Sequence, residues 1–395
     1  MVAGYVGMAK VRGRDLNKTL NWVQGLRGIA ALLVVLTHAR YFLHGTPNEA
    51  LVETLFRPGA MGVDLFFMIS GFIMVLTTSR TDGSIHDTLH FLIKRFARIW
   101  PVYAVLAIIG IQVYWPFDYY TIPANIIGLG KSLLFLPVDP YKPLYFGLPY
   151  GLGWTLNFEM YFYVVFGIAM LAGRFRWIAF FGWLLLTLVA LPYLACGEFT
   201  LDVLHDYHFS IAYLNQVTNP MTWTFAAGVL IGLVYLSPFR LSNGLGTKCL
   251  TIGAVATSIW WAYSGLATFH GIAQWGWPLA VALLILAVAS KTIDFPVPRP
   301  MLWLGEISFS LYLAHYIAQG VITRTLNYFD RHDLTQTWSM IFITSVFALI
   351  FGAISHAVLE KRLSEWVRGR LLNLIMVRRE SGSRRPLSCA SSESV

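Results

Sequence analysis

The stretch LRGIAALLVVLTH, residues 26–38, is a long apolar segment with an arginine near its start and a histidine at its end. Comparable apolar runs, reaching roughly 18–22 residues, recur along the chain without alternating between apolar and polar residues. Because a segment in lipid must satisfy its own backbone polar groups, such runs predict membrane-spanning helices. The predicted spans are 23–43, 60–79, 99–115, 151–171, 177–195, 221–236, 249–265, 274–290, 302–323 and 339–359.

Composition supports the same fold class. The chain has 395 residues, of which 56% are hydrophobic and 12% charged, whereas a soluble domain carries about 25% charged residues. We therefore predict an all-α fold, a polytopic integral membrane helical bundle of about ten transmembrane helices. Segment 121–137 is flanked by prolines and is expected to be re-entrant or interfacial. The first span contains Arg27 and no clear small-x-small cleavage site follows, so it is expected to be an uncleaved helix.

The basic residues predict the orientation. With the N-terminus in the cytoplasm, 23 of the 29 lysines and arginines fall on the inner side, as the positive-inside rule requires. The net charge of +9 is thus a topology signal, and no nucleic-acid partner is expected. The expected organisation is a basic cytoplasmic N-terminal segment at 1–21, a membrane domain at 22–360 and a basic, disordered cytoplasmic tail at 361–395. The three cysteines have no metal or redox spacing, and no metal is predicted.

Ionisable residues inside the spans are candidates for function, with structural pairing as the alternative. Arg27 and His38 are eleven residues apart, which places them on one helix face about 16 Å apart. Counting about 1.5 Å per residue from the span ends puts four groups in one layer, roughly 6–12 Å below the outer surface. Such a layer can hold a general base and its orienting partner. The four groups are His38, Asp64, Glu159 and His315.

A basic cluster lies at the inner side, in FLIKRFARIWP. Arg95 and Arg98 stand on neighbouring turns of a helix, and arginine forks suit phosphate groups. Ordinary inside-positive loop charge is the alternative explanation. Gly59, Gly62 and Gly71, around the second span, are expected to permit close helix packing.

Five motifs follow one another in an order that resembles the membrane-bound acyltransferase-3 family. They are LRGIAALLVVLTH, GVDLFFMISGFIM, FLIKRFARIWPVY, GWTLNFEMYFY and LGEISFSLYLAHY. The resemblance covers about residues 20–360 and is greatest to the members that modify exopolysaccharides. Each motif alone would be weak, but the five in order are specific.

The resemblance implies a transferase that moves an acyl group, usually acetyl from acetyl-CoA, to a sugar hydroxyl of an exopolysaccharide or its lipid-linked precursor. It also implies a multi-pass protein of the bacterial inner membrane, with both termini cytoplasmic. The family's arginine–ten–histidine motif falls on Arg27 and His38, and its arginine pair on Arg95 and Arg98. We expect these arginines to bind the phosphates of acyl-CoA.

The resemblance further assigns Asp64 and Glu159 to the family's acidic positions. His38, oriented by Asp64, is expected to take the proton from the sugar hydroxyl, and an acyl-histidine intermediate is the other possible route. Glu159 and His315 are expected to orient the acceptor or to join the relay. Asn157 departs from the serine common at its position, which affects the subclass rather than the chemistry.

A transporter or flippase for a polysaccharide precursor shares the many spans and the buried charges. Transporters often contain internal repeats, and no convincing repeat relates the two halves of this sequence. A scaffolding membrane protein would not need a layer of ionisable groups. Aromatic residues of segment 114–150 could stack on sugar rings, although an interfacial aromatic belt explains them equally well.

Overall fold

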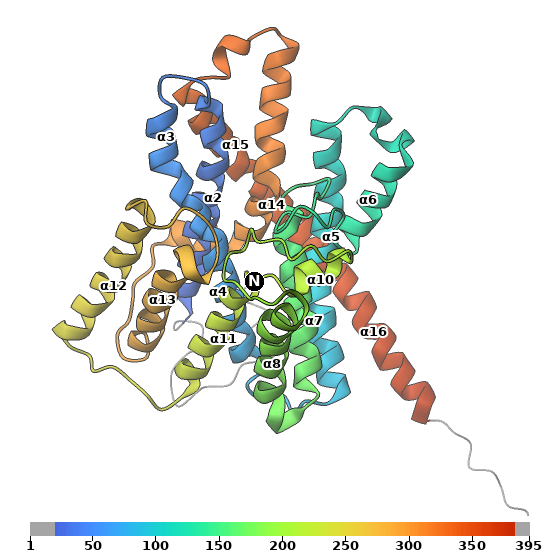
Figure 1. Cartoon of the computed structure of the whole chain (residues 1–395), viewed down its shortest axis with the longest axis vertical. Coiled ribbons are helices and arrows are strands. Elements are labelled where there is room, and N and C mark those ends of the chain that lie inside the picture. Colours follow the sequence, from blue (N-terminus) through green and yellow to red (C-terminus); the bar gives the residue numbers. More distant parts are fainter. Residues whose placement is uncertain (1–19, 384–395) are drawn as a thin grey trace, which may run out of the picture.

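A computed structural model describes residues 20–383 (Figure 1). Most of the N-terminal segment predicted at 1–21 lies outside these residues, as do residues 384–395. Within the described part the chain forms helices and connecting segments and contains no β-strand. The predicted all-α class is confirmed.

The helices follow one another along the chain with short 3₁₀ and π-helical turns between some of them. The longer elements are α2 Asn21–Ala39, α3 Glu49–Phe56, α4 Met61–Thr78, α5 Ile85–Tyr114, α6 Pro123–Leu133, α7 Gly153–Met170, α8 Arg176–Leu185, α9 Leu191–Cys196, α10 Ala212–Val217, α11 Thr222–Leu236, α12 Leu245–Tyr263, α13 Trp277–Ala289, α14 Arg299–Tyr328, α15 Trp338–Ser355 and α16 Ser364–Ser383.

Seven helical segments of the described chain are long and apolar enough to cross a membrane. They are Asn21–Leu43, Glu49–Thr78, Ile85–Tyr114, Gly173–Cys196, Ala212–Leu236, Ile272–Ala289 and Trp338–Leu374. The other three predicted spans coincide with the helices α7, α12 and α14. The polytopic helical bundle is therefore confirmed, and the crossing of these three helices stays a prediction. Segment 121–137 contains α6, which at 11 residues is too short to span a bilayer.

The predicted start of the third span was wrong. Instead of beginning at 99, α5 is one helix of 30 residues that continues through Pro101. Its N-cap is Ser84, whose hydroxyl accepts a hydrogen bond from the backbone N–H of Asp87 at 3.1 Å. Pro101 is tolerated inside the helix because it is buried against neighbouring helices. Arg95 and Arg98 therefore project from a rigid helix and not from a loop.

Glycines bring the central helices together, as the sequence predicted. Gly59 and Gly62 lie against the backbone of α2, and Gly71 lies against the backbone of α11. The approach of α11 to α4 is tightest at Gly228, where an added Cβ would stand 2.0 Å from the carbonyl oxygen of Met68. Such contacts let helix backbones approach closely in the absence of a strong hydrophobic driving force. The helices α2, α4 and α14 that carry the candidate residues are thereby fixed side by side.

The prediction of a disordered tail from 361 was wrong for the part that the structure describes. Residues Ser364–Ser383 form α16, which packs against α5. Val367 and Leu371 lie one turn apart on this helix and are half-buried. The spacing of these two apolar residues gives the basic segment a face that can pack, and this stabilises the helix.

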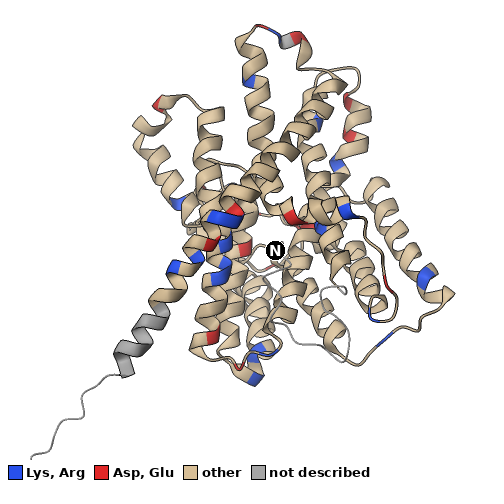
Figure 2. Cartoon of the chain, turned by 180° about the vertical axis from the view of Figure 1, so that it is seen from behind, with Lys and Arg blue, Asp and Glu red and all other residues tan. Residues whose placement is uncertain are grey.

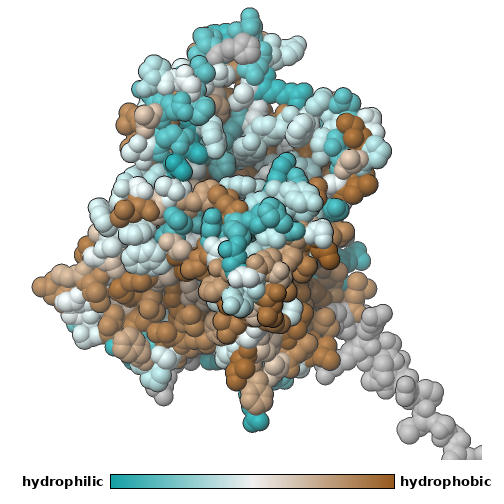
Figure 3. Space-filling model, viewed as in Figure 1, coloured by the Kyte–Doolittle hydropathy of each residue, from teal (hydrophilic) through white to brown (hydrophobic). Residues whose placement is uncertain are grey.

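The surface separates into apolar and polar zones. Figure 3 shows a broad hydrophobic zone over the lower part of the molecule and a mostly hydrophilic upper end. Exposed apolar side chains on α12, including Ile252 and Trp260, contribute to the hydrophobic zone. In Figure 2 charged residues gather at the upper end, at the lower loops and in a central cluster, with long uncharged stretches of helix between them. This distribution fits a molecule that presents apolar surface to lipid.

Candidate active site

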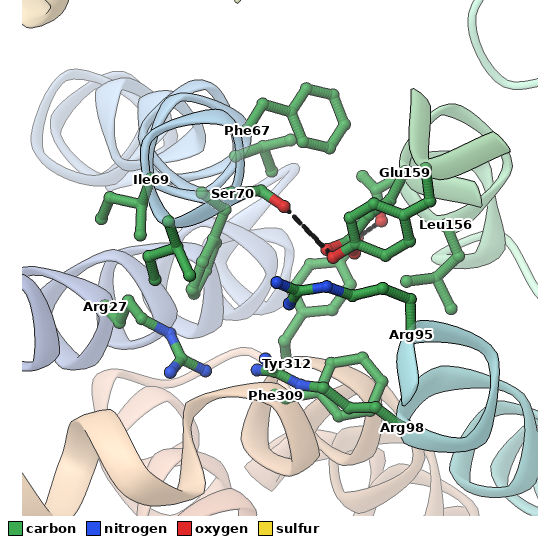
Figure 4. A pocket seen from close by; sticks show the side chains of 15 residues that line it. Arg27, Phe67, Ile69, Ser70, Arg95, Arg98, Leu156, Glu159, Phe309 and Tyr312 are labelled. Atoms are coloured by element: carbon green, nitrogen blue, oxygen red, sulfur yellow. Dashed lines mark hydrogen bonds between the residues drawn. The ribbon is translucent and has the colours of Figure 1, made fainter. Parts of the chain in front are cut away.

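Arg27, Arg95, Arg98 and Glu159 line one cavity, which we call the arginine cavity. Figure 4 shows the three guanidinium groups directed into the same space from α2, α5 and the next turn of α5. Three cations against one carboxylate leave this cavity with an excess of positive charge. The cavity therefore suits a polyanion such as a phosphate-bearing ligand.

Arg27, Arg95 and Glu159, three of the charged groups in the arginine cavity, are each held by hydrogen bonds to neighbours. The guanidinium of Arg27 donates to the hydroxyl of Ser308 at 3.0 Å, and that of Arg95 donates to the hydroxyl of Thr77 at 3.3 Å. Glu159 accepts hydrogen bonds from the hydroxyl of Ser70 at 3.2 Å and from that of Tyr163. Arginines that are positioned before a ligand arrives lose less conformational freedom on binding it.

The structure corrects the predicted location of Glu159. The sequence placed it in one layer with His38, but its carboxylate faces the arginines of the cavity instead. The bounds of α7, Gly153–Met170, agree with the predicted span, but a depth along one helix does not say which neighbouring helices a side chain faces. Depth counted from span ends is therefore a poor guide to which side chains meet.

A second pocket, which we call the central pocket, is lined by His38 and His270. Trp154 packs beside His270, with ring centroids 5.5 Å apart. Arg40 also lines this pocket, and its Nε donates to Oε1 of Glu53 at 2.8 Å. The pocket thus brings two imidazoles together beside two arginines, of which Arg40 is paired with a carboxylate and Arg57 donates to the carbonyl oxygen of Thr268.

The sequence predicted that Asp64 orients His38, but in the structure Asp64 orients His270. Its Oδ2 lies 2.8 Å from Nδ1 of His270, and its Oδ1 accepts the backbone N–H of Gly271 at 2.8 Å. The carboxylate is fully buried. A buried carboxylate needs such partners, and because a carboxylate can only accept, Nδ1 of His270 carries a proton. A histidine held in this way by a carboxylate is the arrangement of a base with its orienting group, in which the neutral ring has its lone pair on Nε2.

His38 and His315 meet across the α2–α14 contact. Their ring centroids are 4.9 Å apart. Nδ1 of His38 lies 2.9 Å from the carbonyl oxygen of Val34, and Nδ1 of His315 lies 2.6 Å from that of Tyr312. Because a carbonyl can only accept, each Nδ1 bears the proton and each Nε2 bears a lone pair. The predicted grouping of these two histidines is found, and Nε2 of His38 is available to act as a base.

The arginine cavity and the central pocket adjoin. Val63 and Tyr312 line both, so these two side chains form the partition between them. The hydroxyl of Tyr312 is 2.9 Å from that of Thr155 and donates to the carbonyl oxygen of Leu152 at 3.2 Å. A third hollow beyond the central pocket shares His38 and Tyr41 with it. Three hollows therefore lie in series, with His38 where the last two meet.

Sequence reasoning missed His270, which lies in the loop between α12 and α13. No periodicity points to it, because its partner Asp64 is 206 residues away and the contact is purely tertiary. It also missed the buried pair of His356 and Glu360, whose Nδ1 and Oε2 are 2.9 Å apart. Their spacing of four residues at the end of the last span was the available signal. Glu360 also accepts from Ser310 of α14 at 2.8 Å.

Fold and site together define a polytopic helical membrane protein with a cationic cavity joined to a pocket of histidines. The profile of the acyltransferase domain family matches residues 20–357. The chain belongs to this acyltransferase family, and it is an acyltransferase.

Several characterised relatives are similar over most of the chain. The exopolysaccharide production protein ExoZ of Rhizobium meliloti is 28% identical over 275 residues, which cover 68% of this chain and 79% of that protein. Nodulation protein 10 of Rhizobium leguminosarum is 26% identical, with 85% and 91% covered. The peptidoglycan O-acetyltransferase OatA of Listeria monocytogenes is 24% identical, with 74% of this chain but only 48% of OatA covered. No solved structure matches the chain.

Proposed function

We propose that this protein transfers an acyl group, acetyl in the first instance, from acyl-CoA to a sugar hydroxyl of an exopolysaccharide or its lipid-linked precursor. The observation that carries the proposal is the series of three hollows, with His38 where the last two meet. A donor bound at one end and an acceptor at the other would bring their reacting atoms together beside one imidazole. The names of two relatives, one for exopolysaccharide production and one for peptidoglycan O-acetylation, favour a polysaccharide acceptor.

The arginine cavity is the proposed site for the phosphates of the donor. Arg95 and Arg98 supply two forks from one helix, and Arg27 faces them from α2 (Figure 4). Charge-assisted bonds from arginine to phosphate are among the strongest polar contacts available to a protein. The pantetheine arm would then pass the partition formed by Val63 and Tyr312 and bring the thioester to the central pocket.

His38 is the proposed general base. Its Nε2 takes the proton from the sugar hydroxyl while the hydroxyl oxygen bonds to the thioester carbonyl carbon. The carbon–sulfur bond then breaks, and the departing thiolate takes up that proton, which leaves an ester and a free thiol. The carboxylate of Asp64, held behind His270, favours the positive charge that forms on His38 in this step. Direct attack by Nε2 of His38 to give an acyl-histidine is the second possible route.

The proposed location is the bacterial inner membrane, with both termini in the cytoplasm. The distribution of lysines and arginines supports this orientation, and it places the arginine cavity toward the compartment that contains acyl-CoA. Alkaline phosphatase fused after residue 395 tests it. An inactive fusion agrees with the proposal, and an active one contradicts it.

The function is tested by the acetyl content of the surface polysaccharide, measured by proton NMR in a deletion strain. Complementation with the wild type should restore the acetyl signals, and complementation with His38→Ala should not. His44→Ala is the matched control, because His44 lies in an exposed pair with Glu49 outside the site. Full acetylation with His38→Ala would refute the role of His38. Loss of the polymer from the surface, instead of its acetyl groups, would favour the flippase alternative.

A further inference from the structure

The third hollow is a groove between α5 and α14, which we call the α5–α14 groove. His38 and Tyr41 lie at its inner end, where it meets the central pocket. It runs along the half of α14 that leads to Tyr328, at the mostly hydrophilic end of the molecule (Figures 1 and 3). Its cavity volume is about 730 Å³, in the upper part of the range of about 300–1,000 Å³ for small-ligand pockets.

One wall of the groove is a regular polar stripe. Gln319, Thr323 and Asn327 lie at intervals of four residues on α14, so their side chains stand one above another on one face. From Gln319 to Asn327 the stripe extends for about 12 Å at about 1.5 Å per residue. Amides and hydroxyls are donors and acceptors at once, and sugar hydroxyls require both. The length of the stripe suits an extended chain better than a single small molecule.

The opposite wall is aromatic. Tyr114 stacks on Tyr316, with ring centroids 4.6 Å apart, and its hydroxyl donates to the carbonyl oxygen of Tyr316 at 2.6 Å. The ring is seated on Gly320, where an added Cβ would come within 2.6 Å of Tyr114. Trp115 follows at the end of α5 and is 49% exposed. Exposed aromatic faces beside hydrogen-bonding groups are suited to the C–H faces of pyranose rings.

The groove does not resemble the donor site. Its described lining contains one arginine, Arg324, whose guanidinium donates to the carbonyl oxygens of Gln112 and Val113 at 2.9 and 3.3 Å. It lacks the converging arginines that hold phosphates in the arginine cavity. Its polar stripe is equally unsuited to a lipid chain, because burying amides against hydrocarbon is costly.

We propose that the α5–α14 groove binds the saccharide acceptor as an extended chain of more than one sugar unit, with the reacting hydroxyl at the His38 end. This inference rests on the proposed function, because it assigns the acceptor of the same reaction. Sugar rings would stack on Trp115 while their hydroxyls bond to the stripe on α14. The acceptor therefore enters from the end of the molecule opposite the phosphate site.

The test uses the full-length protein in lipid nanodiscs with radiolabelled acetyl-CoA. The acceptors are deacetylated oligosaccharides cut from the polysaccharide of the deletion strain and, in a second arm, the same glycan on its lipid diphosphate carrier. Trp115→Ala and Asn327→Leu should each raise the KM for the acceptor about 3–10-fold and leave the Kd for acetyl-CoA unchanged. Phe117→Ala is the control, because Phe117 is 82% exposed and lies two residues beyond Trp115, outside the groove lining.

The outcomes separate the two proposals. If the wild type acetylates a glycan in either arm while both variants keep its acceptor KM, the groove is not the acceptor site and the proposed function stands. If the wild type acetylates neither acceptor, the proposed function itself fails. An unchanged Kd for acetyl-CoA shows that a variant is folded, and a purely interfacial role for Trp115 would leave the acceptor KM unaffected. The extended binding mode also predicts that each variant loses more activity with long oligosaccharides than with short ones. An equal loss with both lengths would overturn it.

Discussion

Replacing Asp64 with asparagine tests whether the pair with His270 contributes to catalysis. Both carboxylate oxygens accept hydrogen bonds, one from Nδ1 of His270 and one from the N–H of Gly271, each at 2.8 Å. Asparagine offers one oxygen and one amino group. The N–H of Gly271 can only donate, so the oxygen of Asn must face it and the amino group must face His270. His270 must then accept at Nδ1 and carry its proton on Nε2.

The substitution therefore removes two features at once, the lone pair on Nε2 of His270 and the negative charge behind it. In the proposed mechanism this pair favours the positive charge that forms on His38, and loss of such an orienting or stabilising charge costs about 10²–10⁴ in rate. We expect kcat of Asp64→Asn to fall within that range. Stability should change much less, because asparagine has nearly the same shape, keeps both hydrogen bonds and removes a buried charge.

The assay is the release of CoA by the nanodisc-embedded protein, together with its thermal midpoint Tm. Asp82→Asn is the matched control, because Asp82 also accepts a backbone N–H, that of Ser84 at 2.8 Å, but lies on an exposed turn between α4 and α5. Asp64→Asn should lose activity at nearly unchanged Tm, and Asp82→Asn should lose none. A kcat for Asp64→Asn within twofold of the wild type would show that the pair with His270 is purely structural.

Three further predictions concern donor binding, packing and pH. Arg95→Gln and Arg98→Gln should each raise the KM for acetyl-CoA about 10–100-fold, which steady-state kinetics would measure; an unchanged KM would move the donor elsewhere. Gly228→Ala should destabilise the α4–α11 contact by about 1–3 kcal/mol or more and lower Tm. Gly253→Ala is the control and should not lower Tm, because nothing lies within 4 Å of an added Cβ there. Equal Tm values for the two variants would contradict the close packing at Gly228. Burial raises the pKa of Tyr145 above its ordinary value, so its hydroxyl keeps its proton below about pH 10. Tyr145→Phe should therefore change the activity by the same factor at every pH below about 10. A pH–rate profile whose alkaline limb shifts in the variant would refute this.

Much of the fold was predictable because hydropathy reports burial in lipid directly. The first half of α5 was missed because residues 85–98 carry charged and polar side chains that lower the hydropathy of the segment, although they continue the helix beyond the predicted span. For α16, which packs against α5, the basic charges concealed a half-buried apolar pair, Val367 and Leu371. In both helices charge was taken as a sign that regular structure had ended.

The candidate site was predictable where residues are related by sequence spacing. Arg27 and His38 share a face of α2, and Arg95 with Arg98 share one of α5, because the helical period fixes their relation. The partner of Asp64 could not be predicted, since His270 reaches it from a loop far along the chain. Spacing within one helix thus identified individual side chains, and the tertiary fold decided which of them interact.

The partition between the arginine cavity and the central pocket has a consequence for the membrane itself. In the proposed orientation the hollows open toward opposite faces of a membrane that stores an electrochemical gradient, where an open path would leak protons and small ions. The partition is formed by two side chains, Val63 and Tyr312, and Tyr312 is tied to α7 through Thr155 and Leu152. In the proposed reaction the acyl arm passes between these two side chains, which must close behind it, so insulation and turnover would depend on the same contact.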